Sequence, residues 1–159
     1  MPVQVMTRDD EAAAVYVKNP PDVPGLAYRI FDAITEGGAD VDMILQTASY
    51  NRKSDIVFTV QRSAADRTEE ILRNLLAEYP ETEIVIERQC TKLCVTGDGL
   101  NGRAGSAAEL FRCLWDAGIR LYGVTTSDVK MTMLVGAADG DRAAEAIVER
   151  LFLSESLIS

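Results

Sequence analysis

The chain has 159 residues, of which 47% are apolar, and its 25 acidic and 16 basic side chains give a net charge of −9. This length allows one ordinary domain or two small ones, and an acidic surface argues against nucleic-acid binding. No apolar run approaches the roughly 20 residues of a membrane span, and the N-terminus lacks the basic start and apolar core of a secretory signal. We expect a cytoplasmic protein that binds neither nucleic acid nor membrane.

Histidine is absent from the sequence. Its absence removes Ser-His-Asp and Cys-His catalysis, His-zinc sites and the usual general base near neutral pH. Cys90, Cys94 and Cys113 are odd in number and show no C-x-x-C spacing, so we expect reduced, buried structural thiols. Carboxylate or lysine chemistry remains open, but no catalytic residue, metal or cofactor is predicted.

The chain begins with two expected strands, Val3–Thr7 and Ala12–Lys18, and the second leads into the turn N-P-P-D-V-P-G. Proline and glycine in such a run are typical of a turn. Apolar residues then recur at helical spacing from Leu26 to Ile34, and Gly37-Gly38 is predicted to end this helix.

A hairpin is predicted next, with strands Val41–Ser49 and Asp55–Val60 joined by a polar loop. Ser63 is a candidate N-cap for the following helix, and residues 82–87 alternate as a half-buried strand does. The resulting order β-α-β-β-α-β is the ferredoxin-like pattern, with both helices on one face of an antiparallel sheet.

The second half of the chain repeats the first. Gly25 corresponds to Gly105 and Gly38 to Gly118, an offset of 80 residues in both cases. The repeat predicts strands Lys92–Thr96, Ile119–Thr126 and Lys130–Gly136, and helices Ser106–Ala117 and Arg142–Phe152.

The second module lacks a final strand of its own, because the tail L-S-E-S-L-I-S is short and polar. We expect the N-terminal strand, residues 2–8, to complete that sheet and leave no open edge. The predicted fold is α+β, with a first module at residues 9–89 and a second at residues 90–159.

The run G-D-G-L-N-G, from Gly97 to Gly102, has the G-x-G-x-x-G spacing of a nucleotide loop. A dinucleotide site also needs a parallel βαβ unit, whereas here the helix leads into a strand and a hairpin. A tight turn from strand to helix, which glycine permits, is the interpretation we favour.

The stretch D-V-P-G-L-A-Y-R-I-F-D-A-I-T-E-G-G-A-D-V-D-M-I-L-Q, followed by S-D-I-V-F-T, resembles the first ACT module of aspartate kinases. Gly97 to Gly105 and the later G-V-T-T-S-D-V-K-M-T-M-L-V resemble the second module. The resemblance implies a non-catalytic regulatory subunit or fragment that binds an amino acid of the lysine or threonine class. It also implies a homodimer and an aspartate kinase catalytic subunit as partners, in feedback control of amino-acid biosynthesis.

An amino-acid effector needs donors for its carboxylate and an anion for its ammonium group. We expect the backbone N–H groups of Gly25, Leu26 and Ala27, at a helix N-terminus, to bind the carboxylate. Asp42 or Asp22 would bind the ammonium group. A simple turn role for Asp22 and a solvated position for Asp42 remain alternatives.

Further site residues are expected on the same strand face as Asp42 and, by resemblance, in the second module of a partner chain. Ser127 is equally a hairpin hydroxyl, and the aromatic side chains Phe31, Phe111 and Trp115 are expected in the core rather than at the ligand. The additional candidates are Gln46, Thr47, Ser49, Arg120, Leu121, Ser127 and Asp128.

Two candidates differ from the residues that aspartate kinases often have. Thr47 and Arg120 each stand where asparagine is common in that family. A guanidinium at Arg120 would repel a lysine ammonium group but would suit a carboxylate. The effector's identity therefore stays open, and a structural module that has lost effector binding is the alternative function.

Overall fold

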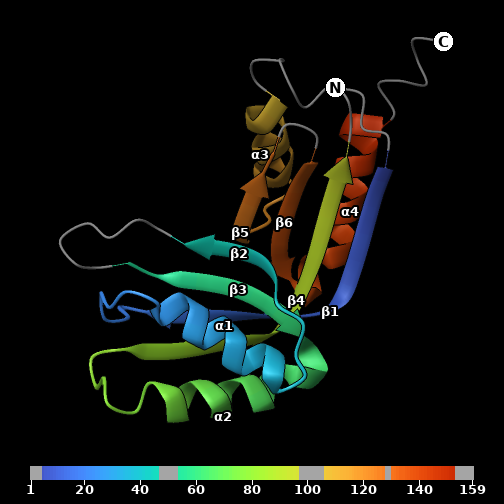
Figure 1. Cartoon of the computed structure of the whole chain (residues 1–159). Helices are drawn as coiled ribbons and strands as arrows, with labels where there is room; N and C mark the ends of the chain where they lie inside the picture. Colours follow the sequence, from blue (N-terminus) through green and yellow to red (C-terminus); the bar gives the residue numbers. More distant parts are fainter. Residues whose placement is uncertain (1–4, 47–53, 97–105, 128–129, 153–159) are drawn as a thin grey trace. The chain divides into compact units, whose positions relative to one another are not determined.

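The computed structural model describes residues 5–46, 54–96, 106–127 and 130–152. The chain divides into two compact units (Figure 1). The first module is Glu11–Gln89, and the second is Met1–Asp10 together with Cys90–Ser159. The architecture is α+β, as the sequence predicted.

Two long strands, β1 (Val5–Lys18) and β4 (Glu83–Thr96), contribute to both modules. Four short strands were expected in their place. Neither span contains Pro or Gly, the residues that weaken or end a strand. Polar residues in the middle of each span interrupt the alternation of apolar side chains. For this reason the sequence predicted two short strands in place of each long one.

The first module contains β2 (Asp42–Gln46) and β3 (Ile56–Gln61), in the strand order β2-β3-β1-β4. Strands β1 and β2 both pair antiparallel with β3. Helices α1 (Leu26–Glu36) and α2 (Ala65–Leu75) pack on one face of this sheet.

The core of the first module lies between that face and the two helices. Ile30, Ile34, Phe58 and Leu72 are fully buried. The ring of Phe31 meets that of Phe58 edge to face, with 5.3 Å between centroids, a favoured aromatic geometry. Phe31 therefore packs against the core, as predicted.

The second module contains α3 (Ser106–Asp116), β5 (Leu121–Thr126) and β6 (Lys130–Gly136). Helix α4 (Gly140–Ile147) follows and continues as one π-helical turn, Val148–Phe152. The strand order is β1-β4-β6-β5. The buried residues that form its core include Leu93, Val95, Leu110, Leu114, Met133 and Ile147.

Glycine ends the first helix of each module. Gly38 has φ 88°, which side chains disfavour, and the next N–H, that of Ala39, donates to the carbonyl of Ile34 at 3.2 Å. These are features of a Schellman cap. Gly118, with φ 71°, occupies the same position after α3. The predicted helix end at Gly37-Gly38 is confirmed.

An arginine from the second helix of each module binds the end of the first. Arg67 Nη1 donates to the carbonyl of Gly37 at 2.6 Å, and Arg142 Nη1 donates to that of Ala117 at 3.2 Å. A cation there satisfies terminal carbonyls and the negative end of the helix dipole. The internal repeat thus extends to how the helices are held together.

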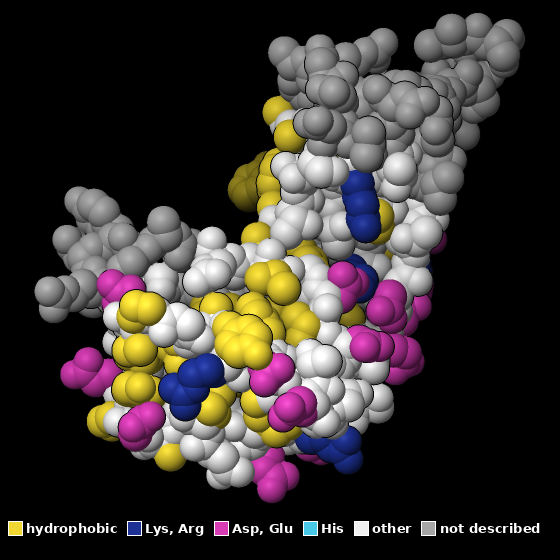
Figure 2. Space-filling view, in the orientation of Figure 1, with side chains coloured by type: hydrophobic (Ala, Val, Ile, Leu, Met, Phe, Trp, Pro, Cys, Tyr) yellow, Lys and Arg dark blue, Asp and Glu magenta, His cyan; other side chains and the backbone are white. Residues whose placement is uncertain are grey.

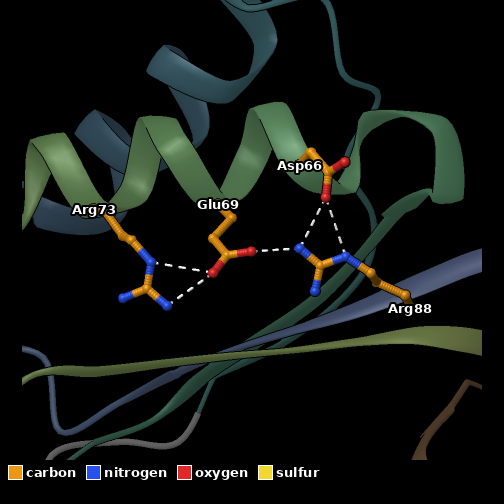
Figure 3. A network of polar contacts seen from close by, with 4 residues as sticks. All are labelled: Asp66, Glu69, Arg73 and Arg88. Atoms are coloured by element: carbon orange, nitrogen blue, oxygen red, sulfur yellow. Dashed lines mark hydrogen bonds and ion pairs between the residues drawn. The ribbon is translucent and has the colours of Figure 1, made fainter.

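An ion-pair network ties α2 to β4 (Figure 3). Arg88 Nη2 lies 2.9 Å from Asp66 Oδ1 and also contacts Glu69, which accepts from Arg73 Nη2 at 2.8 Å. The hydrogen bonds from Arg73 and Arg88 hold the pKa of Glu69 below its usual range.

The predicted N-cap at Ser63 is wrong. A 3₁₀ turn, Arg62–Ala64, precedes α2, so Ser63 lies within this turn and Ala64 occupies the N-cap position, with no side-chain hydrogen bond there. The sequence signal marked the start of helical structure one turn before the α-helix itself.

All three cysteines are free. Cys90 and Cys113 are buried as predicted, but Cys94 is only half-buried. Cys113 Sγ donates to the carbonyl of Ala146 at 3.0 Å, and burial raises the pKa of its thiol. Cys113 therefore packs as a structural thiol.

Candidate functional site

The turn between β1 and α1 is held by its own backbone. Val23 N–H donates to the carbonyl of Pro21 at 2.9 Å, and Leu26 N–H donates to that of Val23 at 3.2 Å. Gly25 is the N-cap of α1 with φ 84°, so glycine suits this conformation. The first helical bond runs from Arg29 N–H to the Gly25 carbonyl, at 3.0 Å.

These bonds change the expected set of anion donors. The N–H of Leu26 is engaged within the turn, and its side chain is buried in the core. The N–H groups of Ala27 and Tyr28 lie in the first helical turn, where the helix supplies no acceptor. Ala27 and Tyr28 are therefore candidate donors to an anion, and Leu26 is not.

Strand β2 carries a bulge that separates two candidate residues. Asp42 is opposite Thr59 of β3, whereas Gln46 is opposite Ile56, and the register shifts between these pairs, where Met43 has φ 39°. Paired residues share a face of the sheet, and residues three apart on β3 lie on opposite faces. The prediction that Asp42 and Gln46 share a face is wrong.

Gln46 lies on the helix-bearing face, at the end of the sheet where the β1–α1 turn begins. Its partner Ile56 also pairs with Val17, next to the end of β1. Asn19 N–H donates to Asp55 Oδ1 at 2.9 Å, which fixes the start of the turn to the start of β3. Gln46 therefore lies on the helix-bearing face at the end of the sheet where the β1–α1 turn begins, and Asp42 lies on the opposite face.

The candidates of the second module are close to one another in sequence but have different surroundings. Arg120 is exposed, and its guanidinium carbon lies 5.9 Å from the ring centroid of Tyr122, within reach of a cation–π contact. Leu121 is half-buried. Ser127 is exposed; its N–H donates to the Lys130 carbonyl at 2.8 Å, and its hydroxyl donates to the same carbonyl at 3.4 Å, which is the hairpin hydroxyl role that the sequence left open.

Several sequence-derived candidates lie outside the described residues. They are Thr47, Ser49, Asp128 and the glycine run from Gly97 to Gly102. Asp22, by contrast, is described and is exposed in the β1–α1 turn, three residues before Gly25. Asp22 is thus the acidic candidate that the turn itself carries.

Exposed aromatic side chains mark the first helix of each module. Tyr28 on α1 is 70% exposed, and Phe111 and Trp115 on α3 are 42% and 81% exposed. The prediction that Phe111 and Trp115 belong to the core is wrong, because α3 buries Leu110 and Leu114 instead. Figure 2 shows apolar side chains gathered on the visible face of the first module, with carboxylates around them.

In the described parts of the chain, no group of three or more His, Cys, Asp or Glu side chains is arranged to hold a metal ion. Within the same residues, no helix is long and apolar enough to cross a bilayer.

Comparison with known proteins shows what this chain is similar to. Residues 93–151 match the model of the ACT domain family. The structure is similar to the regulatory subunit of aspartate kinase from Thermus thermophilus, with a TM-score of 0.84 and 27% identity, covering 94% of this chain and 99% of that one. Residues 93–151 thus match the ACT domain family, and the fold is similar to that of a regulatory subunit of aspartate kinase.

Two curated relatives that the chain matches are aspartate kinases. The chain is 31% identical to an aspartokinase of Corynebacterium glutamicum, covering 91% of this chain and 35% of the relative. It is also 31% identical to an aspartate kinase of Pseudomonas fluorescens, covering 79% and 30%. The chain thus spans about a third of the length of these relatives. The chain is therefore similar to aspartate kinases and to a regulatory subunit of one, which confirms the resemblance drawn from the sequence.

Proposed function

We propose that this chain is the amino-acid-binding regulatory module of an aspartate kinase, and that it acts in feedback control of amino-acid biosynthesis in the cytoplasm. The observation that carries the proposal is the β1–α1 turn, in which Gly25 at φ 84° is the N-cap of α1. Its support is the similarity of nearly the whole chain to a regulatory subunit of aspartate kinase.

The effector's carboxylate binds the N–H groups of Ala27 and Tyr28, where the positive end of the helix dipole favours an anion. Its ammonium group binds Asp22, which is exposed in the same turn, through a charge-assisted hydrogen bond. Gln46, at the same end of the sheet, supplies a neutral polar contact. This set recognises both charged groups of a free amino acid.

A second copy of the chain completes the module. In this proposal Arg120, Leu121 and Ser127 of that copy contribute to the effector site. Tyr28 on α1 is 70% exposed and Trp115 on α3 is 81% exposed, and a dimer contact at either helix would bury apolar area. The dimer regulates a kinase catalytic subunit or domain and is not catalytic itself.

A thermal-shift screen against the twenty amino acids tests the proposal. A ligand at 100 times its Kd stabilises a protein by about 2.7 kcal/mol, which raises the Tm of a chain of this size by several degrees. We expect a shift with one or two amino acids, and a weaker shift with lysine than with a neutral effector because of Arg120. A flat screen would contradict amino-acid sensing and favour the structural-module alternative.

A further inference from the structure

A pocket of about 370 Å³ lies in the first module, where its lining residues 19–21 immediately precede Asp22 of the β1–α1 turn. It is formed by two short segments, residues 19–21 after β1 and residues 78–82 between α2 and β4. Its volume is in the range of small-molecule sites. Neither segment contributed to the sequence-derived site.

Hydrogen bonds between the two segments fix the pocket walls. Thr82 Oγ1 donates to the Asn19 carbonyl at 3.1 Å, and Asn19 Nδ2 donates to the Glu81 carbonyl at 3.4 Å. Thr82 N–H donates to the Tyr79 carbonyl at 3.1 Å. The pocket is therefore formed before any ligand arrives, which lowers the cost of binding.

The lining combines apolar walls with negative charge. Pro20, Pro21 and Pro80 supply hydrocarbon surface, together with the half-buried ring of Tyr79. Glu78 and Glu81 also line the pocket and are exposed. Among the described residues that line it, none is Lys or Arg.

Backbone donors near the pocket are already engaged. The lining residues 78–82 follow helix α2, which ends at Leu75. The Asn19 N–H donates to Asp55 and the Thr82 N–H to Tyr79. These two backbone donors are therefore engaged within the module, and the lining provides no cation for a carboxylate ligand.

We propose that this pocket binds an alkylammonium group, meaning a primary amine on a hydrocarbon stem. The stem packs against the prolines and Tyr79, and the ammonium group binds Glu78 and Glu81. The group belongs to a free amine or to a lysine side chain of a partner chain, and both present the same chemistry. The proposed pocket has a different lining from the carboxylate donors at the start of α1 and does not need a carboxylate on its ligand.

The test is a titration of the isotope-labelled chain with 1,5-diaminopentane, followed by backbone amide NMR. We expect saturable shifts at Asn19, Tyr79 and Thr82, and none with 1,5-pentanediol at equal ionic strength. The variant Glu78→Gln/Glu81→Gln should weaken binding about tenfold. The matched control Glu70→Gln, an exposed glutamate on α2, should bind like the wild type.

Equal shifts with the diamine and the diol, or no effect of the double variant, would overturn the proposal. A second titration with Nα-acetyl-lysine methylamide distinguishes the two sources. Binding as tight as that of the diamine supports a protein side chain, and much weaker binding supports a free amine. Because the diamine has no carboxylate, its failure would not bear on the carboxylate donors Ala27 and Tyr28. A screen that is flat for the neutral amino acids would not bear on this pocket, because they carry no side-chain amine.

Discussion

Thr68 offers a sharp test of how the first module is packed. It lies on α2 and is fully buried, and in the described part of the chain its Oγ1 has no hydrogen-bond partner. Leaving a buried hydroxyl unpaired costs about 1–3 kcal/mol. Thr68→Val replaces the hydroxyl with a methyl group of nearly the same shape. We therefore expect the variant to be more stable by about 1 kcal/mol or more, which raises Tm by about 2–4 °C.

Thr59→Val is the matched control, because Thr59 on β3 is only 2% exposed but its Oγ1 donates to the Asp42 carbonyl at 3.0 Å. Loss of that bond should destabilise the chain by about 1 kcal/mol. The assay is urea unfolding followed by circular dichroism, with unchanged m-values. If Thr68→Val lowered the midpoint as Thr59→Val does, the Thr68 hydroxyl would have a partner and the packing argument would fail.

Three further predictions concern charge, backbone and surface. Arg73 and Arg88 lower the pKa of Glu69 below its ordinary value of 4.5, so its charge stabilises the fold above that pH and the benefit is lost as pH falls through the folded pKa. The Tm advantage of the wild type over Glu69→Gln should therefore shrink below pH 4.5. Gly38→Ala forces a side chain to φ 88° and should cost about 1–2 kcal/mol in urea unfolding, whereas an unchanged midpoint would contradict the cap. Trp115→Ser changes a side chain of α3 that is 81% exposed. It should weaken the proposed dimer in sedimentation while Tm at low protein concentration stays the same. Undiminished dimerisation would exclude this face of α3 from the dimer contact.

Local signals predicted much of the fold. The glycine pair after Glu36 ends α1, and β6 has the predicted bounds of Lys130–Gly136, because glycine and alternation act within a few residues. The 80-residue repeat predicted the same helix-sheet arrangement in both halves. These features depend on residue types and their spacing along the chain, which a single sequence displays.

Other features depend on pairing, which the sequence does not display. The bulge at Met43 places Asp42 on the opposite face of β2 from Gln46. The sequence D-M-I-L-Q contains no signal that predicts this bulge. The continuity of β1 depends on its pairing with β3 and its place beside β4, which outweighs the polar run in its middle.

Exposure of a helix face depends on how the helix is rotated against its sheet. Apolar residues at Leu110, Phe111, Leu114 and Trp115 are consistent with more than one rotation, and only one of these pairs is buried. The sequence likewise could not show which N–H groups of the β1–α1 turn are already bonded. In the structure the Leu26 N–H donates to the Val23 carbonyl. The sequence indicated where a candidate site lies, and the backbone bonds decide which N–H groups that candidate site offers.

The most direct test of the central claim is a backbone amide NMR titration with the amino acid that gives the largest thermal shift, beside its decarboxylated amine. If the chain senses an amino acid through the start of α1, the amides of Ala27 and Tyr28 shift and saturate with the amino acid but not with the amine. If no amino acid perturbs these two amides, or the amine perturbs them equally, α1 does not bind the effector's carboxylate and the proposed site is wrong.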